Sequence, residues 1–113
     1  MTNIKISEIK KEYPNHEVTK GLVKNSWELR EGLSTTVKHY DNLVVVITNN
    51  KLKLYNADYS KTTKKLINTY LPEGMSLVTE RGTTYLVDYL YTIKYKYKNN
   101  MVIDTNTLEV SYK

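Results

Sequence analysis

The strongest constraint on the fold is a run of five aliphatic residues, Leu43–Ile47, which includes three valines. β-branched residues at this density favour a strand, and an unbroken apolar run predicts a strand that is buried on both faces. The pair Asn49-Asn50 follows, and asparagine tolerates the positive φ angles of a type I′ hairpin turn. The next segment, Lys51–Tyr55, alternates between leucines on one face and lysine and tyrosine on the other. The sequence therefore predicts an antiparallel hairpin.

An amphipathic helix is expected after this hairpin, over about residues 61–71. Ser60 is a good N-cap, because its hydroxyl can accept hydrogen bonds from the amides of a first helical turn. The apolar stripe at helical spacing consists of Thr63, Leu66, Ile67, Tyr70 and Leu71. The opposite face carries Lys61, Lys64, Lys65 and Asn68. Pro72 and Gly74 end the helix shortly after Tyr70. The stripe is expected to pack against Val44, Val46, Leu52 or Leu54.

Seven residues of this hairpin and helix form a motif: Tyr40, Asn42, Tyr59, Ser60, Thr62, Thr63 and Ile67. The motif resembles one in small uncharacterised proteins of phages and other mobile elements. Those proteins carry a Tyr-Asn strand, a hairpin and a helix with the signature YS-x-TT-x-x-x-I. Relatives often have a histidine directly before the isoleucine, where this chain has Leu66, so a role for that histidine does not carry over. The resemblance covers about a third of the chain and implies phage-type ancestry, but no activity.

Length and composition narrow the class of protein. The chain has 113 residues and is expected to form a single domain over residues 1–113. It lacks cysteine, which excludes disulfides and thiolate metal sites. No signal peptide and no apolar segment near the roughly 20 residues of a membrane span is present, so a cytoplasmic location without membrane contact is expected. The net charge of +5 is spread evenly and is compatible with nucleic-acid binding or with ordinary solubility.

The flanking segments add a short helix and further strands. Ser7 and Pro14 bound a brief helix predicted over about residues 8–13, and Trp27 with Leu29 lies on one side of a short strand. This tryptophan is either a core anchor or a ligand platform, and its usual high burial favours the core. Further strands are expected at 34–40, 75–79, 83–88, 89–98, 101–103 and 108–112. The predicted fold is α+β, with one principal helix packed on a twisted antiparallel sheet of five to seven strands.

Groups for catalysis are sparse. The chain has two histidines, His16 and His39, far apart in sequence, no glycine-rich phosphate loop and no prominent pair of carboxylates. Ser60 and Thr62-Thr63 form a cluster of hydroxyls, but N-capping and the helix face explain their spacing. We therefore predict no enzymatic activity, no catalytic residue, no cofactor and no metal site.

Two basic surfaces are candidates for partner or nucleic-acid contact. One is the helix face with Lys61, Lys64 and Lys65, where successive turns can follow a phosphate backbone. The other is the strand face with Lys94, Lys96 and Lys98, which has Tyr91, Tyr95 and Tyr97 on its reverse side. Because these tyrosines point away from the lysines, the strand does not combine stacking rings with charge on one face. Both faces are also compatible with simple solvation.

Tyrosine is unusually frequent, with eleven residues and no phenylalanine. This composition suits either the half-buried faces of a small sheet or a recognition surface, since tyrosine is enriched at interface hot spots. We predict a non-enzymatic phage-type binding module, an inhibitor or adaptor of the anti-defence or anti-CRISPR kind, that engages a host protein or ribonucleoprotein. The alternative is a protein that binds nucleic acid directly through its basic helix face.

Overall fold

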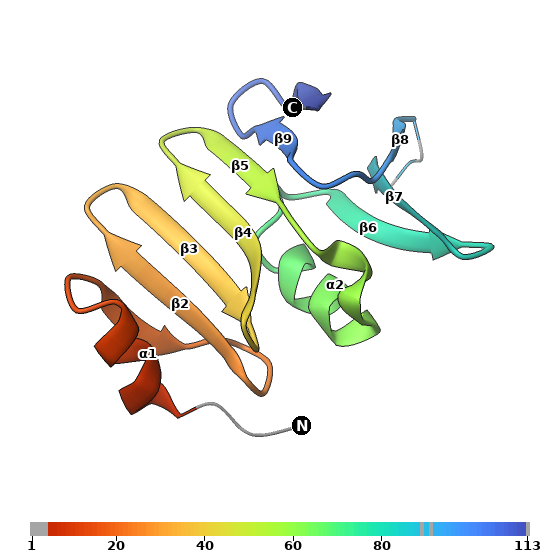
Figure 1. Cartoon of the computed structure of the whole chain (residues 1–113). Coiled ribbons are helices and arrows are strands. Elements are labelled where there is room, and N and C mark those ends of the chain that lie inside the picture. The colour runs from red at the N-terminus through yellow and green to blue at the C-terminus, as the bar shows by residue number, and fades with distance from the viewer. Residues whose placement is uncertain (1–4, 89, 91, 113) are drawn as a thin grey trace.

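Seven strands pair antiparallel into one twisted open sheet with the spatial order β1-β2-β3-β4-β5-β9-β10 (Figure 1). The computed structural model describes residues 5–88, 90 and 92–112. The strands of this large sheet are β1 (Glu17–Lys20), β2 (Ser26–Glu31), β3 (Ser34–His39), β4 (Asn42–Thr48), β5 (Lys51–Leu54), β9 (Met101–Asp104) and β10 (Val110–Tyr112). The predicted α+β class and sheet size are confirmed.

A second, three-stranded sheet was not predicted. It has the order β6-β7-β8 and consists of β6 (Met75–Glu80), β7 (Thr83–Asp88) and β8 (Lys94–Lys96). The segment expected to be a strand over residues 89–98 is a strand at 94–96, and Tyr89 and Tyr91 lie outside the described residues. The late strands thus divide between two sheets, because β8 pairs with β7 whereas β9 returns to pair with β5.

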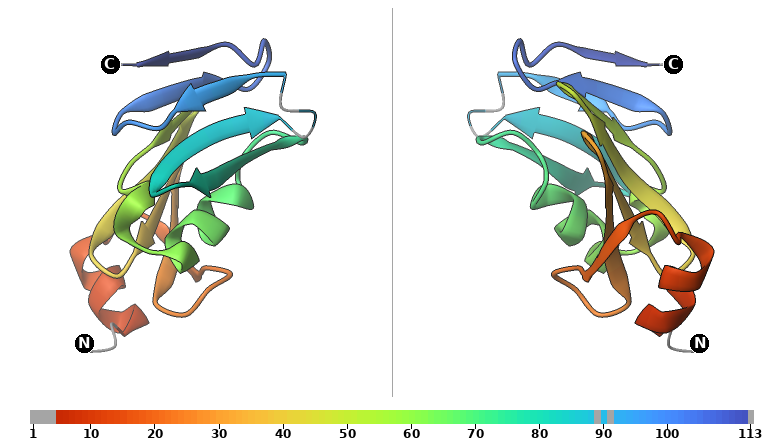
Figure 2. Two further views of the ribbon diagram at one scale, coloured as in Figure 1. Left: turned by 90° about the vertical axis from the view of Figure 1, so that its right-hand side faces the viewer. Right: turned by 90° about the vertical axis from the view of Figure 1, so that its left-hand side faces the viewer.

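The helices lie on opposite faces of the large sheet (Figure 2). Helix α1 (Ile6–Glu12) lies beside β1, whereas α2 (Lys61–Asn68) and the small sheet cover the other face. A short 3₁₀ turn, η1 (Ala57–Tyr59), leads into α2. In the part of the chain that the structure describes, no helix is long and apolar enough to cross a membrane.

A β-bulge in β4 decides which valines face the core. The register of β4 against β3 shifts after the pair Val37–Val45, which leaves Val44 as the extra residue. Val44 and Val45 are both fully buried in the main core, whereas Val46 pairs with Lys53 and is only partly buried. Of the positions expected to pack against α2, Val44 lies in the main core, whereas the prediction for Val46 was wrong. The prediction of a strand buried on both faces fails at the same residue.

Helix α2 is seated as its apolar stripe predicts. The hydroxyl of Ser60 accepts a hydrogen bond from the amide N–H of Thr63 at 3.0 Å, which confirms the N-cap. Leu66 and Ile67 are fully buried in one cluster with Val44, Leu52 and Leu54. Burial of each of these two helix side chains contributes about 1.5–3 kcal/mol of hydrophobic stabilisation.

The helix ends at Asn68 and not at residue 71. The amides of Thr69 and Tyr70 reach carbonyls only three residues back, and the hydroxyl of Thr69 donates to the Leu66 carbonyl at 2.7 Å. These bonds tighten the last turn toward 3₁₀ geometry. The side chain of Asn68 accepts a hydrogen bond from the amide of Leu77 at 2.8 Å, which draws the chain toward β6.

A smaller core holds α1 against the outer strands. Ile9, Val18, Trp27 and Leu29 form this cluster, and Trp27 is only 4% exposed. Trp27 is therefore a core residue, as the usual high burial of tryptophan predicted. The helix spans residues 6–12, two residues earlier at its start than predicted.

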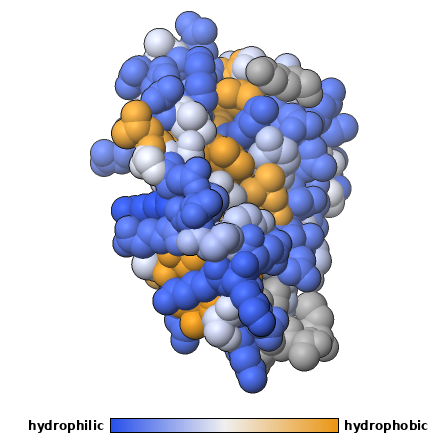
Figure 3. All heavy atoms as spheres, turned by 60° about the vertical axis from the view of Figure 1, so that its left-hand side comes forward, coloured by the Kyte–Doolittle hydropathy of each residue, from blue (hydrophilic) through white to orange (hydrophobic). Residues whose placement is uncertain are grey.

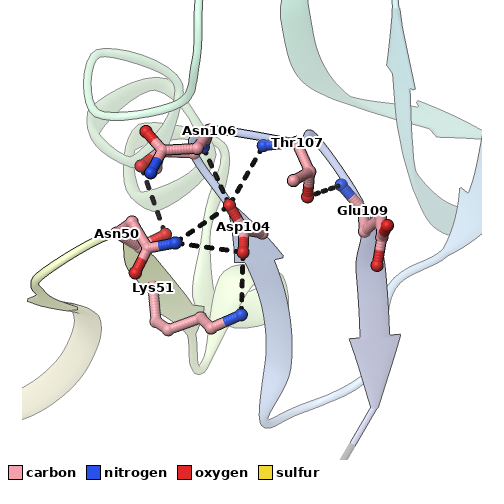
Figure 4. Close-up of polar contacts among 7 residues, drawn as sticks. Asn50, Lys51, Asp104, Asn106, Thr107 and Glu109 are labelled. Atoms are coloured by element: carbon pink, nitrogen blue, oxygen red, sulfur yellow. Dashed lines mark hydrogen bonds and ion pairs between the residues drawn. The ribbon is translucent and has the colours of Figure 1, made fainter.

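One carboxylate joins the ends of two hairpins (Figure 4). Asp104 accepts hydrogen bonds from the Asn50 side chain at 3.1 Å and from Lys51 Nζ at 2.8 Å. The backbone amides of Asn106 and Thr107 donate to the same carboxylate at 2.8 and 3.0 Å. These donors, Lys51 foremost, hold the pKa of Asp104 well below its ordinary value.

The turn that closes the β4–β5 hairpin is tight but is not of the predicted type. Its first residue, Asn49, has a φ of 55°, whereas Asn50 is not among the residues with positive φ. A type I′ turn needs positive φ at both positions, so the predicted turn type was wrong.

Candidate functional site

The three lysines predicted on the helix face differ in their surroundings. Lys61 and Lys65 are exposed. The side chain of Lys64 is only 17% exposed, and its Nζ lies 3.9 Å from Asp58 Oδ1. The acidic partner comes from η1, which folds back beside α2. The basic face of the helix is therefore narrower than the sequence spacing predicts.

The predicted strand lysines divide between two places. Lys94 and Lys96 of β8 are exposed, and Tyr95 between them is partly buried against the main core. The opposite orientation of lysines and tyrosine is thus confirmed within β8. Tyr91 was also predicted at this site and lies outside the described residues. Lys98 is exposed and lies beyond the end of β8.

Tyr112 of β10 connects the two sheets beside these lysines. Its hydroxyl donates to the carbonyl of Lys96 at 2.7 Å. The Nζ of Lys98 lies 5.5 Å from the centroid of its ring. Sequence reasoning did not bring Tyr112 to this place, because the contact depends on how the two sheets sit together.

The outer face of the small sheet combines a tyrosine with two lysines, which sequence reasoning missed. Tyr85 of β7 is the cross-strand partner of Lys96, so both side chains lie on one face. The Nζ of Lys94 lies 4.5 Å from the centroid of the Tyr85 ring and 2.7 Å from Glu80 Oε1. From the sequence, the lysines were compared only with the tyrosines of their own strand, which missed a ring that the neighbouring strand places on the same face. Pairing 83–88 with 94–98 in register would have revealed Tyr85.

A second candidate surface lies on the face of the large sheet opposite α2. There β4, β5, β9 and β10 form a hollow of about 380 Å³, which we call the open-face hollow. It is lined by Val46, Thr48, Lys51, Lys53, Tyr55, Val102 and Ser111. Val46 and Val102 supply apolar surface. Lys53 makes no ion pair with any described residue, whereas Lys51 is paired with Asp104. The hollow thus combines apolar contact, a tyrosine and an uncompensated positive charge.

Polar and apolar residues adjoin on one face of the protein. On the face that Figure 3 shows, hydrophobic residues appear in several small patches between hydrophilic ones. A mixture of this kind is ordinary for a protein surface and does not by itself mark an interface.

The motif residues from two distant segments converge around a buried histidine. The rings of Tyr40 and Tyr59 lie 6.2 Å apart, and both contact the ring of His39. The Nδ1 atom of His39 lies 2.7 Å from the hydroxyl of Thr63, which in turn lies 2.9 Å from the hydroxyl of Ser60. The structure therefore brings together residues that are about twenty positions apart in sequence.

The environment of His39 assigns this cluster a structural role. Burial lowers the pKa of His39, although a hydrogen bond from its ring to the Lys24 carbonyl acts in the opposite direction. The ring is neutral at pH 7, with its other nitrogen accepting from Thr63. Both ring nitrogens are engaged inside the fold, so the cluster fastens the end of β3 to the start of α2.

The described residues contain no group of three or more histidine, cysteine, aspartate or glutamate side chains that could hold a metal ion. Comparison of the chain with protein-family models, with curated proteins and with solved structures finds no match. The functional argument therefore depends on the geometry of the surfaces described above.

Proposed function

We propose that this chain is a non-enzymatic binding module of phage or mobile-element type. In this proposal it acts in the cytoplasm of a host cell as an inhibitor or adaptor, in the manner of anti-defence or anti-CRISPR proteins. Its partner is a host protein or ribonucleoprotein, and its contact surface is the open-face hollow.

The single observation that carries the proposal is the composition of this hollow. Most of the opposite face of the sheet is covered by α2 and the small sheet, whereas β4, β5, β9 and β10 leave a concave surface here. Val46, which is only partly buried, can bury against an apolar group, and Tyr55 has the ring and hydroxyl typical of interface anchors. A concave site with an apolar floor and a polar rim is the usual form of a recognition pocket.

The charge of the rim indicates the chemistry of the partner. Lys53 has no acidic partner among the described residues, so it can pair with a carboxylate from outside. We infer that the hollow receives a protein segment with one apolar side chain flanked by acidic residues. A basic surface is also incompatible with mimicry of DNA, which needs negative charge.

A variant-resolved capture experiment tests this proposal. Tagged wild type, Lys53→Glu and Tyr55→Ala are each incubated with a host lysate, and Lys61→Glu on the exposed face of α2 is the charge-matched control. We expect one protein to be retained by wild type and Lys61→Glu but lost by both hollow variants. The captured protein is then purified and its affinity for each variant is measured. Equal retention by all four proteins would remove the hollow as the contact surface.

Direct nucleic-acid binding is the second candidate, and the outer face of the small sheet favours it. Tyr85 provides a ring on which a base can stack, and Lys94 and Lys96 lie on the same face. A gel shift with single-stranded DNA or RNA across a salt series distinguishes this function, because phosphate contacts weaken steeply as salt rises. Replacing Lys94 and Lys96 by alanine should flatten the slope, and absence of any shift at low salt excludes this candidate.

A further inference from the structure

A separate hollow of about 590 Å³ lies where the start of α1 meets the turn between β1 and β2. It is lined by residues 5–6 and 20–27 and shares no lining residue with the open-face hollow. Sites for small molecules have volumes of about 300–1,000 Å³. This β1–β2 hollow is therefore large enough for a small organic ligand.

The lining of the β1–β2 hollow is positively charged. Lys5, Lys20 and Lys24 contribute to it, and none of its lining residues is acidic. All three lysines are exposed, and none forms an ion pair within the described part of the chain. Lysines gathered around a concave surface concentrate anions there, because a cleft with walls of one charge sign focuses the field. The hollow therefore favours an anionic ligand.

The turn that lines this hollow is held in place by hydrogen bonds that its backbone carbonyl groups accept. The carbonyl of Val23 accepts from both the amide and the hydroxyl of Ser26, at 3.3 and 2.5 Å. The carbonyl of Asn25 accepts an amide from the β3–β4 turn at 2.7 Å, and that of Lys24 accepts from the ring of His39. Three successive acceptors are thus engaged within the fold. A pre-formed turn whose acceptors are already bonded binds an anion with little ordering cost.

Trp27 lies at the base of this hollow and is almost wholly buried. Its indole N–H is buried and has no hydrogen-bond acceptor among the described residues. Buried donors are almost always paired, so this N–H lacks the partner that a buried donor normally has. The side chain of Ile6 lines the same hollow and adds apolar surface.

From these observations we propose that the β1–β2 hollow binds a small phosphate ester, such as a nucleoside monophosphate. The phosphate oxygens accept charge-assisted hydrogen bonds from the lysines. The organic part of the ligand packs on the apolar side chains of Ile6 and Leu22, which line the same hollow. This site is independent of the proposed protein contact, because the two hollows lie at different ends of the large sheet.

The single tryptophan makes the proposal directly measurable. In an ¹H–¹⁵N spectrum of the full chain, Trp27 contributes one indole N–H resonance, which is titrated with adenosine 5′-monophosphate, with inorganic phosphate and with adenosine. We expect a saturable shift with the monophosphate, weaker binding of inorganic phosphate and no saturable shift with adenosine. The affinity for the monophosphate should fall as salt rises, because screening weakens the lysine contacts.

Paired variants locate the binding site. We expect the double variant Lys20→Ala/Lys24→Ala to lose at least about tenfold in affinity, whereas Lys20→Arg/Lys24→Arg retains binding. The double variant Lys61→Ala/Lys65→Ala removes the same charge from α2 and should bind as wild type. The proposal is overturned if the indole resonance shows no saturable shift with up to about 10 mM monophosphate, because a Kd weaker than this corresponds to only a few kcal/mol of binding free energy. An equal loss in the α2 control, or equal binding of adenosine, also overturns it.

Discussion

Replacing Thr63 by valine removes one hydroxyl from the interior without changing the shape of the side chain. Thr63 is fully buried, and its hydroxyl bridges the Nδ1 atom of His39 and the hydroxyl of Ser60 at 2.7 and 2.9 Å. Valine keeps the branched Cβ and leaves the backbone N–H of residue 63 able to donate to the N-cap. The substitution therefore tests the hydrogen bonds alone.

The expected loss of stability follows from the groups that remain. His39 is 3% exposed, so its Nδ1 atom becomes a buried acceptor without a donor. Such a group costs about 1–3 kcal/mol. Ser60 is only partly buried, and water can replace the lost acceptor of its hydroxyl at little cost. We therefore expect Thr63→Val to lower the free energy of unfolding by about 1–3 kcal/mol.

Urea unfolding at pH 7, followed by the fluorescence of Trp27 and by circular dichroism, measures this loss. The matched control is Thr62→Val, which makes the same change at the neighbouring exposed position of α2. Exposed substitutions of this kind usually change stability by less than about 0.5 kcal/mol. If the two variants lose the same stability, the hydrogen-bonded bridge does not exist as described and the reasoning is refuted.

Three other substitutions test the core and the charged groups. Leu66→Ala should lower the free energy of unfolding by about 2–5 kcal/mol, because it opens a cavity in the main core, and Lys65→Ala is the exposed control for chemical denaturation. Asp104→Asn should destabilise the protein at neutral pH and flatten the loss of stability below about pH 4. The reason is that the pKa of Asp104 is lower in the folded than in the unfolded chain, so its ionised carboxylate stabilises the fold above the unfolded pKa and this stabilisation is lost as pH falls. Asp41→Asn is the control in the same pH series, and a slope unchanged by Asp104→Asn would contradict the clamp. For His39 the lowered pKa means that the unfolded chain binds more protons, so stability should fall as pH drops below about 6.5. That slope should disappear in His39→Gln, and its persistence would show that another group titrates.

Local patterns in the sequence predicted the elements near the centre of the chain. The valine run, the asparagine pair and the alternation after it predicted the β4–β5 hairpin, because each depends on residues within a few positions. Ser60 and the stripe with Leu66 and Ile67 predicted the start and buried face of α2 for the same reason.

Features that depend on pairing between distant segments were not predictable in this way. Val45 and not Val46 faces the core, because a bulge opposite β3 shifts the alternation of β4. Tyr85 lies beside Lys94 only because β7 and β8 pair in a particular register. The end of α2 at Asn68 likewise depends on a hydrogen bond to β6.

The candidate sites likewise combine features that local sequence predicts with features that depend on the tertiary structure. The sequence by itself determined which residues carry charge, that the central segments form a hairpin and where the principal helix begins, since these follow from side-chain chemistry and short-range periodicity. Tertiary structure alone decided that Lys64 is paired with Asp58, that three lysines line one hollow near the start of α1, and that Val46 and Val102 line another. Each of these arrangements joins residues from separate elements, and their positions are set by the packing of the two sheets and two helices.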